Sequence, residues 1–460
     1  MTAPAARTGG RASAAWADAS NVALLADLYE LTMVQAYLAE GLSGSATFSL
    51  FARRLPRGRN YLVAAGLEDA LRTLESLRFE QEALEWLRSL RLFDDRLLHW
   101  LESFCFSGDV EAAPEGTPLF GGEPLLEVTA PIAEAQLVET LLMNQVHLQT
   151  VAASKAARVV GAARGRTVVD FGARRMHGAD AAVKVARAAY LAGCDSTSNV
   201  LAGHLYGIPL AGTMAHSWVQ AHATEIEAFR AFARTWPNTV LLVDTYDTLA
   251  GVREVVRLSR ELGPDFHVQA VRLDSGDLLE LSRAARRILD EAGLSRVGIF
   301  ASGGLDERAV ERLVRAGAPI GGFGVGTSMG VSDDAPALDV AYKLVSYAGR
   351  DRLKLSPGKE LWPGPKQVFR LERGGTAEGD VLARRGEELP GRPLLLPVMR
   401  GGRRLPGPTL AEARQHARRE RERLPDRLLS LEPADPPYPV EPSEGLRALR
   451  DRLAAEHHAR

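Results

Sequence analysis

A chain of 460 residues with 46% hydrophobic and 25% charged residues has the composition of an ordinary globular protein, and it is too long for a single core. Its formal net charge of −2 at pH 7 provides no overall attraction to nucleic acid or to an anionic membrane, so we expect neither as a partner. The two cysteines, Cys105 and Cys194, are too few for a disulfide framework or a four-thiolate zinc site, and we expect a protein of the reducing cytoplasm.

The first 165 residues have the pattern of a tail followed by an α+β region. Residues 1–20 consist mainly of small residues and arginines without the apolar core of a signal peptide, so we expect a disordered tail. In residues 21–165 helices and strands are mixed without strict alternation, which indicates the N-terminal part of an α+β sandwich domain. The predicted elements are, in chain order, a helix ending near Gly41, a strand at 46–54, helices within 66–103, a strand at 123–131 and a long helix at 132–163.

Strand and helix patterns alternate from residue 166 to residue 348. Amphipathic helix patterns follow four apolar strand patterns, at 179–193, 248–262, 278–293 and 305–317. Right-handed crossovers in such repeats give a parallel sheet with its helices outside. A polar cluster follows each apolar run, which is typical of a (β/α) barrel, where chemistry lies at the C-terminal strand ends. A doubly wound open sheet stays possible, although no G-x-G-x-x-G pattern supports it.

Residues 349–460 return to short strands separated by proline and glycine. We assign them to a C-terminal part that packs on the sandwich domain. Residues 410–427 interleave arginine with glutamate, which predicts a solvated helix. His457 and His458 near the chain end lack further ligands, so we expect no metal site there.

Two of the predicted strand ends are charged. Arg174 and Arg175 follow an apolar strand in DFGARR, and paired guanidinium groups form forked contacts with phosphate or carboxylate. Arg272 and Asp274 lie two residues apart in VRLDSGD. A cation and an anion on one side of a site suit a substrate with an acidic group and vicinal hydroxyls. A surface salt bridge would explain either pair in isolation.

Two further strand ends are rich in glycine. Gly303 and Gly304 occur in FASGG, while Gly326 and Thr327 occur in GFGVGTS. Glycine-rich turns that lead into helices bind phosphate through backbone N–H groups and the helix dipole. Either motif alone is weak evidence, but two on consecutive strand ends of a barrel predict a phosphate site.

The remaining candidate is His216 in GTMAHSW. An isolated histidine of this kind is more often structural than functional. In a phosphate-lined site the balance changes, because a carboxylate can fix the tautomer of an imidazole and make the other nitrogen a nucleophile. Asp244 of VDTYD is the candidate carboxylate.

Seven segments together resemble the nicotinate phosphoribosyltransferase family. In chain order they are DLYELTM, DFGARR, GTMAHSW, VDTYD, RLDSGD, FGVGTS and KLSPGKELWPGPKQVFR. They cover residues 21 to about 370. The resemblance implies a β/α barrel joined to a sandwich built from both chain ends. It also implies a homodimer with shared active sites, in which nicotinate and phosphoribosyl pyrophosphate give nicotinate mononucleotide and pyrophosphate. ATP hydrolysis is coupled to this reaction through a phosphohistidine, and Mg²⁺ assists.

The family resemblance assigns roles to single residues of this sequence. His216 matches the phosphorylated histidine, and Asp244 matches its supporting carboxylate. Tyr29 matches the aromatic residue that stacks on the pyridine ring across the dimer. The matched substrate-binding residues are Phe171 for the other ring face, Thr213 and Arg272 for the carboxylate, Asp274 for the ribose, and Gly303, Gly304, Gly326 and Thr327 for the 5′-phosphate. Some relatives have a late cysteine-based zinc site, but no cysteine follows Cys194 in this chain.

Three other functions remain open from the sequence. The nicotinamide-using sister enzyme shares the fold and the histidine, and the orientation of Asp195 near the pocket is undecided. A ligand-sensing barrel without catalysis would not need His216. A quinolinate-type decarboxylating enzyme would need a more basic pocket and no ATP.

Overall fold

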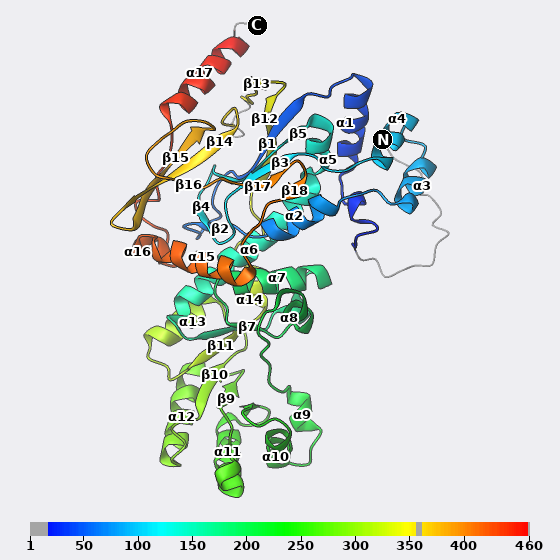
Figure 1. The fold of residues 1–460 in the computed structure, drawn as a ribbon. Helices are drawn as coiled ribbons and strands as arrows, with labels where there is room; N and C mark the ends of the chain where they lie inside the picture. The colour runs from blue at the N-terminus through cyan, green and yellow to red at the C-terminus, as the bar shows by residue number, and fades with distance from the viewer. Residues whose placement is uncertain (1–16, 356–360, 459–460) are drawn as a thin grey trace. The chain divides into compact units, whose positions relative to one another are not determined.

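The computed structural model describes residues 17–355 and 361–458, and its internal contacts divide the chain into two units (Figure 1). The sandwich unit comprises residues 1–150 and 337–460, and the barrel unit comprises residues 151–336. The predicted tail lies outside the described residues up to position 16, and so do residues 356–360 of the last family motif.

The divisions between the units fall at residues 150/151 and 336/337, whereas the sequence placed them at 165/166 and 348/349. At the first division helix α6 (Glu139–Ala163) continues without interruption, so hydrophobic spacing contains no signal for it. Near the second, strand β12 (Val340–Tyr347) pairs with β1 (Ser45–Ala52) of the sandwich unit. A strand's partner, rather than its sequence, decides which unit it joins.

The sandwich unit draws its elements from both ends of the chain. Its first part contains η1 (Val22–Leu24), α1 (Leu28–Ala39), β1, β2 (Leu62–Val63), α2 (Leu67–Ser76), α3 (Gln81–Ser89), α4 (Asp95–Glu102), β3 (Asp109–Ala112), β4 (Pro118–Leu119), β5 (Pro124–Pro131), α5 (Ile132–Leu137) and the start of α6. Its second part contains β12, β13 (Arg350–Asp351), β14 (Lys366–Arg373), β15 (Thr376–Arg384), β16 (Arg392–Pro393), β17 (Leu396–Arg400), β18 (Arg403–Arg404), α15 (Leu410–Glu422), α16 (Asp426–Leu429), β19 (Val440–Pro442) and α17 (Glu444–His458).

Strand β1 lies inside the larger sheet of this unit, whose order is β13-β12-β1-β5-β3-β17-β18. Seven of its eight residues are buried, because both faces of the strand are covered. Phe48 of β1 stacks on Tyr342 of β12, with ring centroids 4.8 Å apart. A second sheet, in the order β16-β14-β15-β19, contains the buried ion pair between Arg370 and Asp380. The expected α+β sandwich built from both chain ends is therefore confirmed.

The barrel unit alternates strands with helices. After the end of α6 it contains β6 (Thr167–Asp170), η2 (Ala173–Arg175), α7 (Ala179–Leu191), β7 (Ser196–Thr197), α8 (Val200–Tyr206), α9 (His216–Gln220), α10 (Glu225–Thr235), β8 (Val240–Leu242), α11 (Thr248–Leu262), η3 (Gly263–Asp265), β9 (Ala270–Leu273), α12 (Leu278–Glu291), β10 (Gly298–Ala301), α13 (Glu307–Arg315), β11 (Gly322–Val325) and α14 (Thr327–Gly330).

The six strands of this unit form a parallel sheet in the order β7-β6-β11-β10-β9-β8. The first strand, β6, pairs with the last, β11, as the strands of a barrel do when the ring closes. The described ring is open between β7 and β8, and the chain that joins these two strands contains α8, α9 and α10. The predicted barrel-like α/β fold is confirmed, with a curled, incompletely closed sheet.

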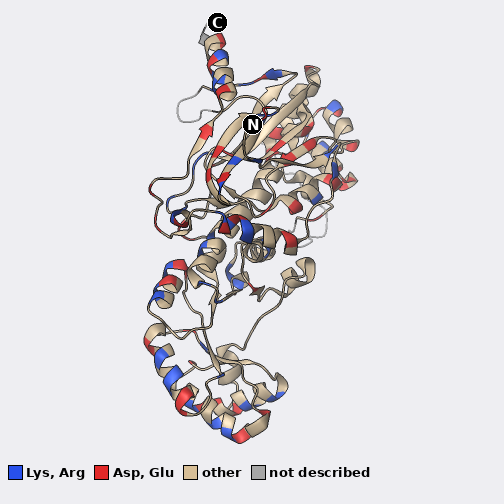
Figure 2. Cartoon of the chain, turned by 60° about the vertical axis from the view of Figure 1, so that its left-hand side comes forward, with Lys and Arg blue, Asp and Glu red and all other residues tan. Residues whose placement is uncertain are grey.

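Charge is distributed unevenly over the barrel unit (Figure 2). Acidic and basic side chains lie mainly on its helices, whereas Asp170 and Arg272 are the only such residues within its six described strands. Burying a charged group inside a sheet is costly unless it is paired or used. These two positions therefore point to the functional end of the sheet. Within the part of the chain that the structure describes, no helix is long and apolar enough to cross a membrane.

Candidate active site

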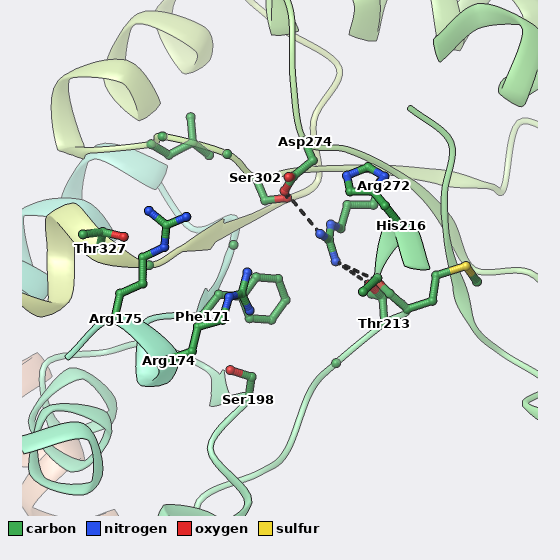
Figure 3. Close-up of a pocket in the computed structure, with 18 of the residues that line it drawn as sticks. Phe171, Arg174, Arg175, Ser198, Thr213, His216, Arg272, Asp274, Ser302 and Thr327 are labelled. Carbon is green, nitrogen blue, oxygen red and sulfur yellow. Dashed lines mark hydrogen bonds and ion pairs between the residues drawn. The ribbon is translucent and has the colours of Figure 1, made fainter. Parts of the chain in front are cut away.

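A cavity of about 710 Å³ lies at the C-terminal ends of the parallel strands (Figure 3). It is lined by every predicted site residue except Asp244 and Tyr29. Figure 3 shows Arg175 and Thr327 on one side, Arg272 and Thr213 on the other, and the ring of Phe171 between them. The sheet brings these segments together because the C-terminal ends of parallel strands meet at one edge.

Arg272 is the best-connected side chain of this cavity. It lies on β9, and its Nη1 donates to Thr213 Oγ1 at 2.5 Å. Its Nη2 donates to Asp274 Oδ1 at 3.2 Å, and the guanidinium carbon lies 5.7 Å from the ring centroid of Phe171. The Nε–H is buried and has no hydrogen-bond partner among the described residues. A fixed guanidinium with a spare donor beside an aromatic ring suits a planar ligand with a carboxylate.

Asp274 is held from two directions. Its Oδ1 accepts a hydrogen bond from Ser302 Oγ at 2.5 Å, and its backbone N–H donates to Asp244 Oδ2 at 3.0 Å. The same Asp244 oxygen accepts from Ser275 Oγ at 2.5 Å. Asp244 therefore fixes the end of β9, and Asp274 is left facing the cavity.

His216 is the first residue of α9, and its Nδ1 lies 3.1 Å from Thr245 Oγ1. From the sequence we expect Asp244 in this place, whereas the structure has Thr245 there. Asp244 Oδ2 accepts hydrogen bonds from Asp274 N and Ser275 Oγ at the end of β9. Asp244 is directed to the neighbouring strand end instead. Its assignment as a catalytic residue stays a prediction.

The loops that follow β10 and β11 depend on glycine. Gly303 has a φ of +87°, and a Cβ there would collide with the carbonyl oxygen of Asp274. Gly304 also has a positive φ, of +62°, but open space surrounds it. Gly326 caps α14, which begins at Thr327, and a Cβ on Gly324 would press into the Phe171 ring. At Gly303 and Gly324 the backbone therefore takes a course that a side chain would block.

The loop after β6 contains two exposed arginines and follows the hydrogen-bonded carboxyl group of Asp170. Arg174 and Arg175 are exposed, and neither forms an ion pair within the described part of the chain. Asp170 below them is buried, and it accepts hydrogen bonds from Gly172 N and Thr197 Oγ1. Burial raises the pKa of the Asp170 carboxyl, and these two hydrogen bonds oppose the shift. The pair of guanidinium groups forms the positive wall of the cavity.

Comparisons with known proteins identify the family. Two family models match, described as the nicotinate phosphoribosyltransferase N-terminal domain over residues 24–147 and the nicotinate phosphoribosyltransferase family over residues 167–347. The chain belongs to the nicotinate phosphoribosyltransferase family.

Individual members of the family are similar over most of the chain. A nicotinate phosphoribosyltransferase of Mycobacterium tuberculosis is 57% identical over 436 residues, which are 94% of this chain and 93% of the relative. One from Bacillus subtilis is 41% identical over 379 residues, covering 80% and 77% respectively. The crystal structure of human nicotinic acid phosphoribosyltransferase matches with a TM-score of 0.83 at 30% identity, covering 93% of this chain and 99% of the human one.

Several residues that line the cavity are not among the predicted site residues, and Ser302 and Ser198 are two polar examples. Ser302 precedes Gly303 within the FASGG motif, so its place in that strand end was a usable signal. Ser198 follows the two-residue strand β7, which has no apolar run to reveal it. Asp195 does not line the cavity, because its Oδ2 accepts the backbone N–H of Val168.

Tyr29 is not among the residues that line the cavity. It belongs to α1 in the sandwich unit of this phosphoribosyltransferase chain, and 44% of its surface is exposed. Burial and the charge of Glu139, to which its hydroxyl donates, raise the pKa of Tyr29. A half-exposed aromatic ring whose hydroxyl is held by a hydrogen bond is suited to stacking on a planar ring.

Proposed function

We propose that this chain transfers the phosphoribosyl group of phosphoribosyl pyrophosphate to nicotinate, forming nicotinate mononucleotide and pyrophosphate in NAD salvage. Family membership over most of the chain supports this reaction. The observation that carries it is the arrangement of Arg272 and Thr213 opposite Thr327 of the second glycine loop, with Phe171 between them. A carboxylate recognition point and a phosphate recognition point thus face one cavity.

Each part of the two substrates has a proposed partner. The nicotinate carboxylate pairs with Arg272 and Thr213, and its ring lies against Phe171. The ribose hydroxyls donate to Asp274. The 5′-phosphate accepts from the backbone N–H groups of the loops at Gly303–Gly304 and Gly326–Thr327, and Arg174 and Arg175 face the pyrophosphate. The ring nitrogen bonds to C1′ while the bond from C1′ to the pyrophosphate oxygen breaks, and positive charge develops on the ribose between these groups.

We also propose Mg²⁺ as a cofactor. Among the described residues no three His, Cys, Asp or Glu side chains are grouped to hold a metal ion. Asp274 lines the cavity, and Asp244 Oδ1 is buried without a described hydrogen-bond partner. One or two carboxylates suit an ion that takes its other ligands from phosphates and water. The ion would neutralise charge on the departing pyrophosphate.

The coupling of ATP is proposed to pass through His216. Because Nδ1 faces Thr245, Nε2 is the nitrogen left to accept the terminal phosphoryl group of ATP. The bond from that phosphorus to the ADP oxygen breaks, and the imidazole releases its phosphoryl group to water later. Two added negative charges beside the pyrophosphate site would change the affinity for pyrophosphate.

Incubation with ATP labelled in its terminal phosphate tests this step. We expect acid-labile label on His216 in the wild type and none in His216→Ala. Thr245→Val should slow labelling by about tenfold, because the imidazole loses the group that orients it. Asp244→Asn should also slow it, through the displaced end of β9. Label on another residue, or ATP hydrolysis that depends on nicotinate in the alanine variant, would contradict the proposal.

The overall reaction is tested by product formation from nicotinate, nicotinamide and quinolinate, each with and without ATP. We expect nicotinate to be strongly preferred, with ATP increasing the yield. Equal use of nicotinamide would favour the sister enzyme, and carbon dioxide released from quinolinate would favour the decarboxylating one. Binding without any product would indicate a sensing barrel.

Two further expectations belong to the same proposal. We propose that the enzyme acts in the cytoplasm, where the thiols of Cys105 and Cys194 would stay reduced. We also propose a homodimer in which Tyr29 of each chain completes the partner's site.

A further inference from the structure

The barrel unit contains a buried ammonium group outside the set of residues that line the cavity. Lys155 on α6 is only 2% exposed, and its Nζ contacts three carboxylates. Nζ lies 2.6 Å from Glu307 Oε2, 2.8 Å from Asp334 Oδ1 and 3.2 Å from Asp333 Oδ1. Arg158, one turn further along α6, donates from Nε to the other oxygen of Glu307 at 3.0 Å.

The three carboxylates lie in the segments that follow the two glycine loops of the site. Glu307 is the first residue of α13, the helix that follows Gly303 and Gly304. Asp333 and Asp334 follow α14, the short helix that begins at Thr327. One ammonium group therefore connects the chain behind the first loop with the chain behind the second.

The charge of Lys155 is stable in this position. Burial by itself would lower the pKa of Lys155, but the charge of Glu307 and the contact with Asp334 outweigh it and raise the pKa. Burial would likewise raise the pKa of Glu307, yet Lys155 and Arg158 bring it below its usual value. Both groups therefore stay ionised at neutral pH.

A gain in folding stability is by itself a weak explanation for this cluster of buried charges. The desolvation of a buried ion pair offsets most of its Coulomb attraction, and apolar residues of similar volume often stabilise a fold as well. A buried pair does, however, permit only a narrow range of geometries. The benefit of this cluster is therefore expected in the placement of the two loops.

We propose that Lys155 is a positioning residue that sets the distance between the two phosphate-binding loops. This inference rests on the proposed function, because it assumes that both loops bind phosphate groups of phosphoribosyl pyrophosphate. It predicts that breaking the connection weakens the binding of that substrate and spares the binding of nicotinate.

The main test is the double variant Asp333→Asn/Asp334→Asn. Both side chains are about half exposed, so the variant should fold, and it releases the second loop while Glu307 stays paired. We expect KM for phosphoribosyl pyrophosphate to rise about tenfold, as small misplacements in a site can cost up to 100-fold. KM for nicotinate and kcat should change less than about twofold, as a loss of binding alone predicts.

Glu261→Gln is the matched control. It breaks the ion pair between Arg230 of α10 and Glu261 of α11, which is similarly exposed and does not line the cavity. Its KM values should equal those of the wild type. Lys155→Arg should keep most of the affinity for phosphoribosyl pyrophosphate, whereas Lys155→Met should lose it.

Two results would overturn the inference. The first is a reduced Tm in Lys155→Met and in the double variant with KM for phosphoribosyl pyrophosphate unchanged, which would make the cluster merely structural. The second comes from calorimetric titration with inorganic pyrophosphate and inorganic phosphate, which needs no turnover. Equal affinities in wild type and double variant would reject the positioning role. A wild type that binds these anions but makes no product would instead reject the proposed function.

Discussion

At the residue scale, we expect substrate selectivity to depend mainly on Arg272. Its side chain has partners on both sides, Thr213 and Asp274, so its guanidinium is already oriented before a ligand arrives. A neutral amide gains little from this orientation, whereas a carboxylate forms a charge-assisted pair. We therefore predict that the preference for nicotinate over nicotinamide depends on Arg272.

Replacing Arg272 with alanine tests this preference. We expect kcat/KM for nicotinate to fall about 10- to 100-fold, since hydrogen bonds to charged groups contribute about 1.5–3 kcal/mol. Affinity for phosphoribosyl pyrophosphate should change far less. Arg272→Lys should recover part of the loss, because lysine keeps the charge without the fork. Steady-state kinetics with each substrate varied in turn provide the measurement, and Arg283→Ala on the outer helix α12 is the control. An equal loss for nicotinate and nicotinamide would contradict the assignment.

At the scale of single elements, the loop after β10 provides a matched pair of glycines. Gly303→Ala places a Cβ against the Asp274 carbonyl. The Cβ of Gly304→Ala lies in open space, so the only cost of that change is the backbone strain of a positive φ. We expect Gly304→Ala to cost about 1 kcal/mol of unfolding free energy and to keep activity. Gly303→Ala should displace Asp274 and lower kcat/KM for phosphoribosyl pyrophosphate more than tenfold. Equal effects of the two changes would show that the collision does not control the site.

Helix α10 begins with a carboxyl group of unusual pKa. Burial, together with the charges of Glu254, Asp244 and Asp247, raises the pKa of Glu225 from 4.5 to about 7. In the folded state this group holds a proton that the unfolded chain has already lost at pH 5 or 6. Its contribution to stability is therefore complete below about pH 4.5 and is lost as the pH rises through about 7.

Glu225→Gln should remove that pH dependence. We expect its Tm to equal that of the wild type near pH 4.5 and to exceed it by about 2–4 °C at pH 8, a modest value because Glu225 is partly exposed to solvent. Thermal unfolding across this range is the measurement, and the exposed Glu227 of the same helix is the control position. A constant difference in Tm at all pH values would mean that Glu225 does not titrate in this window.

At the scale of the whole molecule, the sequence predicted the order and type of the elements better than it predicted which side chains and strands contact one another. Apolar runs followed by charged or glycine-rich ends located β6, β9, β10 and β11, and with them most of the cavity. Local patterns cannot reveal which side of a strand end faces which neighbour. For that reason Asp244 was assigned to His216 in place of Thr245. The unit boundaries were displaced for a related reason, since β12 joins its sheet through β1, a strand from the other end of the chain.

Shared sites between two chains can be tested by complementation. We expect Tyr29→Ala and His216→Ala to be nearly inactive each, because one lacks the stacking ring and the other the phosphoryl acceptor. Mixed after dissociation and reassociation, they should regain up to about a quarter of wild-type activity, because half the random dimers are hybrids with one intact site each. Exchange between chains with different tags, followed by mass measurement, is the control. Verified exchange without recovered activity would place Tyr29 in the site of its own chain.

The construction of the sandwich unit from both chain ends also has a consequence for synthesis on the ribosome. Arg53 beside β1 and its ion-pair partner Asp339 beside β12 are 286 residues apart in sequence. At cellular translation rates the first segment therefore waits on the order of 15 to 60 seconds for the second. During that time β1 and β3 are the outer strands of an incomplete sheet, because β12 and β17 have not yet been made. Open strand edges recruit other strands, so a nascent or truncated chain of this protein should depend on chaperones until β12 and β17 emerge.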